Sequence, residues 1–151
     1  MAANVGLPVL EIGEVIRLAV APVFLLSGVG ITLTLLVNRL ARVIDRARAL
    51  EGDESQSLPH GRADLEARLS TLTVRARLLG RAIALSTICA LLVSMVVVTL
   101  FIGALFEIRV GLVIAAEFIV AMFSLIGALL YFLREVFLAT RTLRIGLRHP
   151  A

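Results

Sequence analysis

Glu117 has the clearest capacity for chemistry in this sequence, because it is an ionisable side chain inside the otherwise apolar residues 112–133. A carboxylate inside a membrane is costly and typically serves an ion or proton pathway, or pairs with a cation. Arg17 and Arg109 are the candidate partners, since both are predicted on the side of the membrane nearer to Glu117. Glu117 lies only about 9 Å of helical rise from that end, so a structural ion pair or snorkelling is the alternative interpretation. In either case Glu117 is expected to face protein or water and not lipid.

A second group of polar residues lies in the first apolar run, residues 18–37. Gly28 and Thr32 are four residues apart, as are Gly30 and Thr34, so each pair shares one face of a helix. Small residues on one face allow membrane helices to approach closely, which makes helix packing the expected role of Gly28 and Gly30. In a homo-oligomer, the hydroxyls of Thr32 and Thr34 would instead line a narrow pore.

The sequence contains no pattern typical of an enzyme. Ser57 and Thr73 have no histidine and carboxylate at a revealing spacing, and no glycine-rich phosphate loop follows a strand. His60 and His149 are isolated, without companions at metal-ligand spacing. Cys89 is the single cysteine and is expected to pack in a helix interface. We therefore expect no catalytic residue, no metal and no cofactor.

The elements that position these residues follow from composition. Of the 151 residues, 60% are hydrophobic and 17% are charged, which excludes an ordinary soluble domain. The apolar residues gather in three runs, at residues 18–37, 82–106 and 112–133, each long enough to cross a membrane as a helix. The predicted fold class is therefore all-α, a polytopic membrane protein with three transmembrane helices in a single domain, residues 1–151. The short link at residues 107–111 makes the last two helices antiparallel neighbours.

The distribution of arginine predicts the orientation of these helices. Thirteen arginines lie between the first and second runs or after the third, whereas only Arg17 and Arg109 lie on the other side. The positive-inside rule then places the N-terminus and residues 107–111 outside, and the long loop and the C-terminus in the cytoplasm. The expected location is the inner (plasma) membrane.

Each apolar run is predicted to continue into the cytoplasm as a coiled-coil-like helix. Apolar residues beyond the runs recur at alternating spacings of about three and four, which is the heptad pattern. The extensions would form a helical hairpin over residues 38–81 and a C-terminal helix over residues 134–148, with an exposed turn at residues 51–61. The seams consist of Leu40, Val43, Ala47 and Leu50, then Leu65, Leu69, Leu72, Ala76, Leu79 and Ile83, and finally Val136, Ala139, Leu143 and Leu147.

The arginines next to the apolar runs have two interpretations. Juxtamembrane arginines contact anionic headgroups, which stabilises each by about 1 kcal/mol. In an assembly of several copies, they would instead form a basic ring at a pore mouth. Nucleic acid is not an expected partner, because aromatic residues are not interleaved with the basic ones. The arginines concerned are Arg39, Arg42, Arg77 and Arg81.

Three segments carry a resemblance to a known family. They are NRLARVIDRARAL after the first run, RARLLGRAIALS at the start of the second, and LIGALLYFLREVFLATRTL at the end of the third. Together they resemble the bacterial inner-membrane family catalogued as domain of unknown function 2721, over about residues 15–147. The resemblance implies a small three-helix bacterial membrane protein, and it assigns no catalytic or binding residue.

Two functional hypotheses follow. The leading one is a homo-oligomeric ion channel or pore, because three helices from one copy are too few to enclose a solvated path. The alternative is a non-conducting accessory or scaffold subunit of a larger membrane complex. In the channel hypothesis the polar face of residues 27–34 surrounds a water-filled pore. In the accessory-subunit hypothesis the same face packs against another protein, without water between them.

Overall fold

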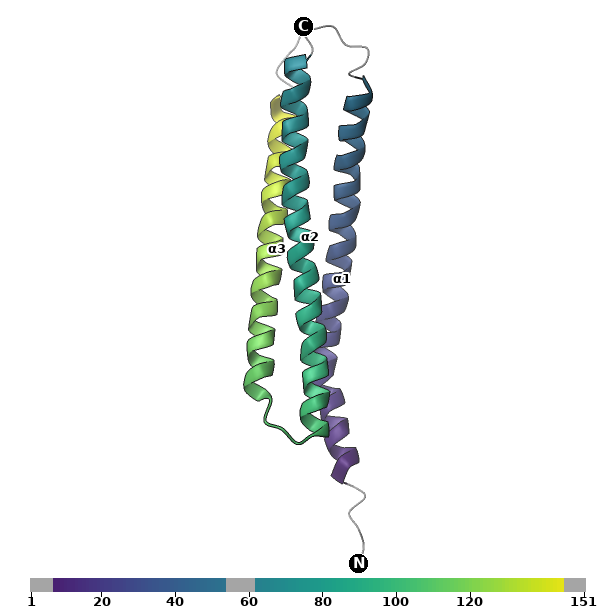
Figure 1. Ribbon diagram of the computed structural model, residues 1–151, viewed down its shortest axis with the longest axis vertical. Coiled ribbons are helices and arrows are strands. Elements are labelled where there is room, and N and C mark those ends of the chain that lie inside the picture. The colour runs from purple at the N-terminus through teal and green to yellow at the C-terminus, as the bar shows by residue number, and fades with distance from the viewer. Residues whose placement is uncertain (1–6, 54–61, 146–151) are drawn as a thin grey trace, which may run out of the picture. The chain divides into compact units, whose positions relative to one another are not determined.

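Three long α-helices make up the described part of the chain. The computed structural model describes residues 7–53 and 62–145, with side chains for residues 13–52 and 65–140. The helices are α1 (Leu7–Asp53), α2 (Arg62–Leu105) and α3 (Gly111–Ile145), and no strand occurs within these ranges (Figure 1). The all-α prediction is therefore confirmed.

All three helices are long and apolar enough to cross a membrane, by length and composition. The stretches that meet this condition are Gly13–Gly52, Leu65–Leu105 and Gly111–Thr140. Each includes one of the three predicted apolar runs, so the chain is a multi-pass membrane protein with three candidate spans. Residues 54–61 of the predicted turn, with Ser57 and His60, lie outside the described residues, as do His149 and Leu147; the side chain of Leu143 does too.

The helices pack in two units. Unit 1 comprises Met1–Thr32 and Ser86–Leu125, and unit 2 comprises Leu33–Leu85 and Ile126–Ala151. Each unit therefore takes one segment from every helix.

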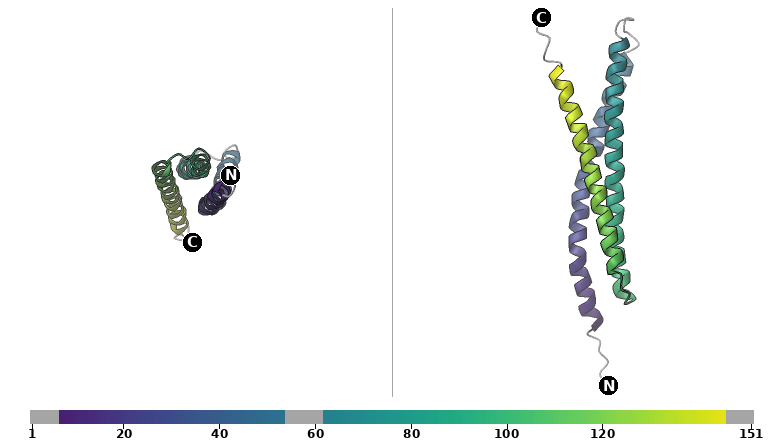
Figure 2. Two further views of the ribbon diagram at one scale, coloured as in Figure 1. Left: turned by 90° about the horizontal axis from the view of Figure 1, so that it is seen from below. Right: turned by 90° about the vertical axis from the view of Figure 1, so that its left-hand side faces the viewer.

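Within unit 1, a tight turn joins α2 to α3, and it is visible in Figure 1 and in the right-hand view of Figure 2. Glu107 adopts a positive φ of 53°, and the Ile108 amide donates to the Gly103 carbonyl at 3.0 Å. A Cβ at Gly103 would overlap the side chain of Val110, so glycine allows the turn to fold back onto α2. The two helices are antiparallel neighbours here, as the short link predicts.

The interior of unit 1 is built mostly from small and β-branched side chains. On α2 the buried residues recur at spacings of three and four, which keeps them on one face of the helix. Ala19 and Val29 of α1 and Ala121 of α3 are also buried in this unit. The buried side chains of this face of α2 are those of Ser86, Cys89, Val93 and Val96.

Unit 2 has a more aliphatic core. Leu36 and Val43 from α1 cluster with Leu79 and Ala82 from α2. Several of the predicted seam residues of α1 and α2 pack in or against this cluster. Gly127 on α3 also permits a close approach, because a Cβ there would lie 3.1 Å from Leu85. The partly buried residues around the cluster are Leu40, Leu72, Ala76, Ile83, Tyr131 and Phe132.

The outer faces of the helices carry large apolar side chains. Phe24 and Ile31 on α1, Leu91 on α2, and Leu112 and Phe123 on α3 are all exposed. Contiguous apolar surface of this kind is unusual on a soluble monomer and suits contact with lipid.

Candidate functional site

Glu135 is a fully buried charged residue on α3. It follows Ala121 and Ala128 at intervals of seven residues, and both alanines are buried as well. Because seven residues make nearly two turns of an α-helix, the three side chains lie along one inward-facing line. The Glu135 carboxylate therefore lies on the face of α3 where the other residues at this seven-residue spacing are buried.

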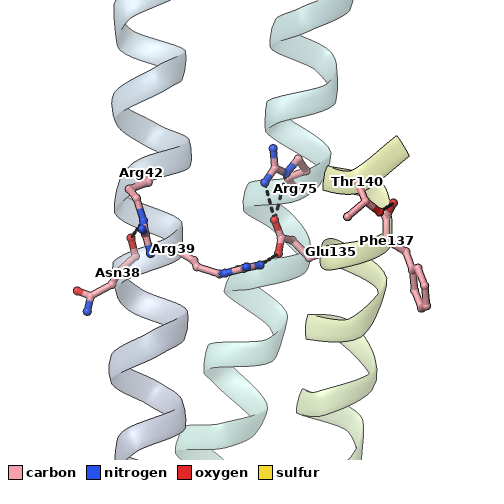
Figure 3. Close-up of polar contacts among 7 residues, drawn as sticks. All are labelled: Asn38, Arg39, Arg42, Arg75, Glu135, Phe137 and Thr140. Carbon is pink, nitrogen blue, oxygen red and sulfur yellow. Dashed lines mark hydrogen bonds and ion pairs between the residues drawn. The ribbon is translucent and has the colours of Figure 1, made fainter. Parts of the chain in front are cut away.

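Two arginines from the other helices of unit 2 bind this carboxylate. Arg39 of α1 donates from Nη1 to Oε2 of Glu135 at 2.7 Å. Arg75 of α2 donates to Oε1 from both Nη2, at 2.7 Å, and Nε, at 3.1 Å. Figure 3 shows the two guanidinium groups reaching the same carboxylate from different helices. All three helices of unit 2 therefore meet at one ionic cluster, called the Glu135 triad below.

Within the Glu135 triad, the glutamate side chain is the member least exposed to solvent. The Glu135 side chain is 1% exposed, against 16% for Arg75 and 35% for Arg39. Both carboxylate oxygens accept charge-assisted hydrogen bonds, which are the strongest class of protein hydrogen bond. The guanidinium carbon of Arg39 also lies 5.1 Å from the centre of the Phe132 ring, within cation–π range. This arrangement joins the three helices of unit 2 through charged contacts.

The second carboxylate of interest, Glu117, lies in unit 1 and is partly buried. Thr99 of α2 donates from Oγ1 to Oε1 of Glu117 at 3.3 Å, and Oε2 is buried without a hydrogen-bond partner. Neither candidate partner is bound to it. Arg17 instead pairs with Glu14 at 2.8 Å, because residues three apart on one helix meet without any tertiary contact, and Arg109 is exposed in the turn.

Gly28 and Gly30 lie on a face of α1 that points away from the buried residues of unit 1. Gly28 and Gly30 are exposed, and a Cβ at either would meet nothing within 4 Å. Val29 between them is the residue that turns inward. The hydroxyl of Thr32 donates to the Gly28 carbonyl at 3.0 Å within the same helix. Gly28 and Gly30 therefore make no close packing contact at the Cβ position within the described chain, and their packing against a helix of another chain stays a prediction.

The four arginines of the predicted basic ring have separate environments. Arg39 is engaged in the Glu135 triad, whereas Arg42 is exposed and donates from Nε to the Asn38 carbonyl at 3.3 Å. Arg81 lies 5.8 Å from the centre of the Tyr131 ring, and Arg77 is exposed. The predicted packing leucines also differ, since Leu79 is buried and Leu72 packs on the core, while Leu65 and Leu69 are half-buried.

Sequence reasoning missed Arg75 and Glu135 as a pair. Glu135 follows the third apolar run by two residues, a position typical of a charged residue at the membrane–water interface. The available signal was the seven-residue interval from Ala121 through Ala128, which predicts an inward position for residue 135. Among the residues that the structure describes, no group of three or more His, Cys, Asp or Glu side chains is placed to hold a metal.

Comparison with known proteins gives one match. The family model described as "Protein of unknown function (DUF2721)" matches residues 19–145. No curated protein and no solved structure matches the chain. The matched range includes all three residues of the Glu135 triad.

Proposed function

The chain belongs to the family described as Protein of unknown function (DUF2721), and from that premise we propose that it is a non-enzymatic, non-conducting subunit that assembles with other membrane proteins or with its own copies. The alternative interpretation of the sequence thus becomes the leading one. The observation that carries it is the open face of α1 at Gly28 and Gly30. Glycines on an exposed face of a membrane helix suit close contact with a helix from another chain.

We further propose that the protein lies in the bacterial inner membrane, with its N-terminus outside. The support is the excess of arginine after the first and third apolar runs. In this orientation the arginines that follow the first and third runs lie on the cytoplasmic side, where they meet anionic headgroups. We also propose that all three helices continue into the cytoplasm as coiled-coil-like extensions. Nucleic acid is not among the proposed partners.

The internal contacts of Glu117 and Arg39 favour an accessory subunit over a pore. A channel built on the sequence hypothesis needs Glu117 at one mouth and arginines such as Arg39 at the other. Glu117 is instead hydrogen-bonded to Thr99 of its own chain, and Arg39 is bound to Glu135. Side chains held in contacts between helices of one copy are poorly placed to form a ring around an axis shared by several copies.

The open face is tested by Gly28→Leu. A Cβ at residue 28 has no atom within 4 Å, so we expect an unchanged fold together with loss of the native assembly. The readout is the mass of the particle in mild detergent, by native mass spectrometry. Gly13→Leu is the matched control, because Gly13 is also on α1 with nothing within 4 Å of a Cβ. If the Gly28→Leu protein keeps the wild-type assembly, this face is not the interface.

A homo-oligomeric pore is the second candidate, favoured by hydroxyl-bearing residues on the same part of α1. Ser27 and Thr34 are exposed there. If native mass spectrometry finds a ring of four or more identical copies, electrical recording in planar bilayers becomes the deciding test. A stoichiometric complex with unrelated subunits supports the accessory function, whereas selective currents through the ring would replace it with the pore.

A further inference from the structure

A hollow of about 210 Å³ in unit 2 has an unusual concentration of positive charge. It is lined by Arg39, Arg42 and Arg46 of α1, Arg75 of α2, and Glu135 of α3, together with two apolar residues, Val43 and Ala139. Four arginines face one glutamate, which leaves three net positive charges around the hollow. A single water needs about 10–15 Å³ of such space, so the hollow has room for a larger polar group.

The arginines that line this hollow are not all neutralised by protein groups. The two oxygens of Glu135 are already occupied by Arg39 and Arg75. Arg42 uses only its Nε, on the backbone of Asn38, and within the described residues neither Arg42 nor Arg46 forms an ion pair. Asp45, the acidic neighbour of both on α1, is exposed and does not line the hollow. The guanidinium groups of Arg42 and Arg46 are therefore available to an anion.

Arginine geometry and the level of the hollow identify the kind of anion. The planar guanidinium fork matches the spacing of phosphate oxygens and can bind them in pairs. Arg39, Arg42 and Arg46 follow the end of the first apolar run at residue 37 by two, five and nine residues. At about 1.5 Å per residue these positions lie about 3, 8 and 14 Å beyond the hydrocarbon region, so Arg39 and Arg42 fall in a headgroup layer about 5–8 Å deep. Arg46 lies beyond that layer, and its long side chain can extend back toward it.

We propose that this hollow is a binding site for the phosphate of an anionic phospholipid headgroup, held by Arg42 and Arg46 beside the Glu135 triad. The triad fixes Arg39 and Arg75 on two walls of the site, so the site is assembled only when the three helices of unit 2 are packed. The proposal rests on the membrane placement proposed above for unit 2, and it does not depend on assembly through α1.

The test compares two double variants of equal charge in the purified full-length protein. Arg42→Gln with Arg46→Gln removes the two available guanidinium groups, and Arg48→Gln with Arg77→Gln removes two exposed arginines that do not line the hollow. Retention of added phosphatidylglycerol is measured by native mass spectrometry, with phosphatidylethanolamine as the zwitterionic reference. We expect the pocket double variant to lose affinity about tenfold or more, and the control about twofold or less.

Two outcomes would overturn the proposal. Equal losses in both double variants would mean that the arginines attract lipid only through a diffuse charge. Displacement of the lipid by millimolar inorganic phosphate would assign the hollow to a soluble phosphate compound instead of a lipid. Since neither Arg42 nor Arg46 holds another helix, the helical circular dichroism of the pocket variant should match that of the control, which separates lost binding from lost folding.

Discussion

Glu117 and Glu135 show how two carboxylates on the same helix acquire different environments. They are eighteen positions apart on α3, which is five turns of an ideal helix, so local geometry gives them the same direction. Glu135 in unit 2 binds arginines from both other helices, whereas Glu117 in unit 1 accepts one hydrogen bond from Thr99 and has a buried, unpartnered oxygen. The difference comes from the neighbouring helices and not from α3 itself.

The comparison separates two ways of placing an acidic side chain in an apolar protein. A buried carboxylate with charged partners on both sides is a strong local constraint, because removal of one member leaves the others without compensation. When a carboxylate is hydrogen-bonded only to one hydroxyl, removal of its charge changes the free energy of unfolding little. The stability of unit 2 should therefore depend on the charge of Glu135, and the stability of unit 1 should change little when the charge of Glu117 is removed.

The largest expected effect is that of Glu135→Gln. It removes the charge that two arginines bind, and we expect a loss of about 3–5 kcal/mol in the free energy of unfolding. The measurement is the loss of helical circular dichroism as denaturing detergent is titrated into mild detergent micelles. Glu117→Gln, the same substitution on the same helix, is the matched control and should change this free energy by about 1 kcal/mol or less. Equal losses from both variants would abolish the distinction between the two carboxylates.

A smaller effect is expected for the arginines, in a defined order. Arg75→Gln should cost about 2–3 kcal/mol, because Arg75 is 16% exposed and donates twice to Glu135. Arg39→Gln should cost about 1 kcal/mol, since Arg39 is 35% exposed and donates once. The same unfolding titration measures both. The reverse order would show that the contact of Arg39 with Phe132, and not the ion pair, dominates at this site.

The smallest effect belongs to the hydrogen bond of unit 1. Thr99→Val removes the donor to Glu117 while keeping the side-chain shape, and the 3.3 Å distance indicates a weak bond. We expect a loss of about 0.5–1 kcal/mol. A double-mutant cycle with Glu117→Gln isolates the pairwise free energy. A coupling as large as that of Arg75 with Glu135 would contradict the contrast between the units.

Several features of the fold were predictable from local sequence. The three helices follow from the length of the apolar runs, and the antiparallel pairing of α2 and α3 follows from a link too short for any other arrangement. The spacing of Leu79 placed it in a predicted packing seam, and its side chain is buried. The open face at Gly28 and Gly30 was not predictable, because small residues mark a face suited to packing without stating which chain packs there.

The sequence by itself determined the class of this protein, since hydrophobicity and helical periodicity are local properties that one chain segment carries without its neighbours. The sequence also identified Glu117 as unusual, because a charged residue within an apolar run can be recognised from the order of residues alone. Only the tertiary structure decided that Glu135 has ionic partners on two other helices, because Arg39 and Arg75 are 96 and 60 residues away along the chain. Ion pairs between helices depend on which faces meet, and that is settled by the packing of all three helices together.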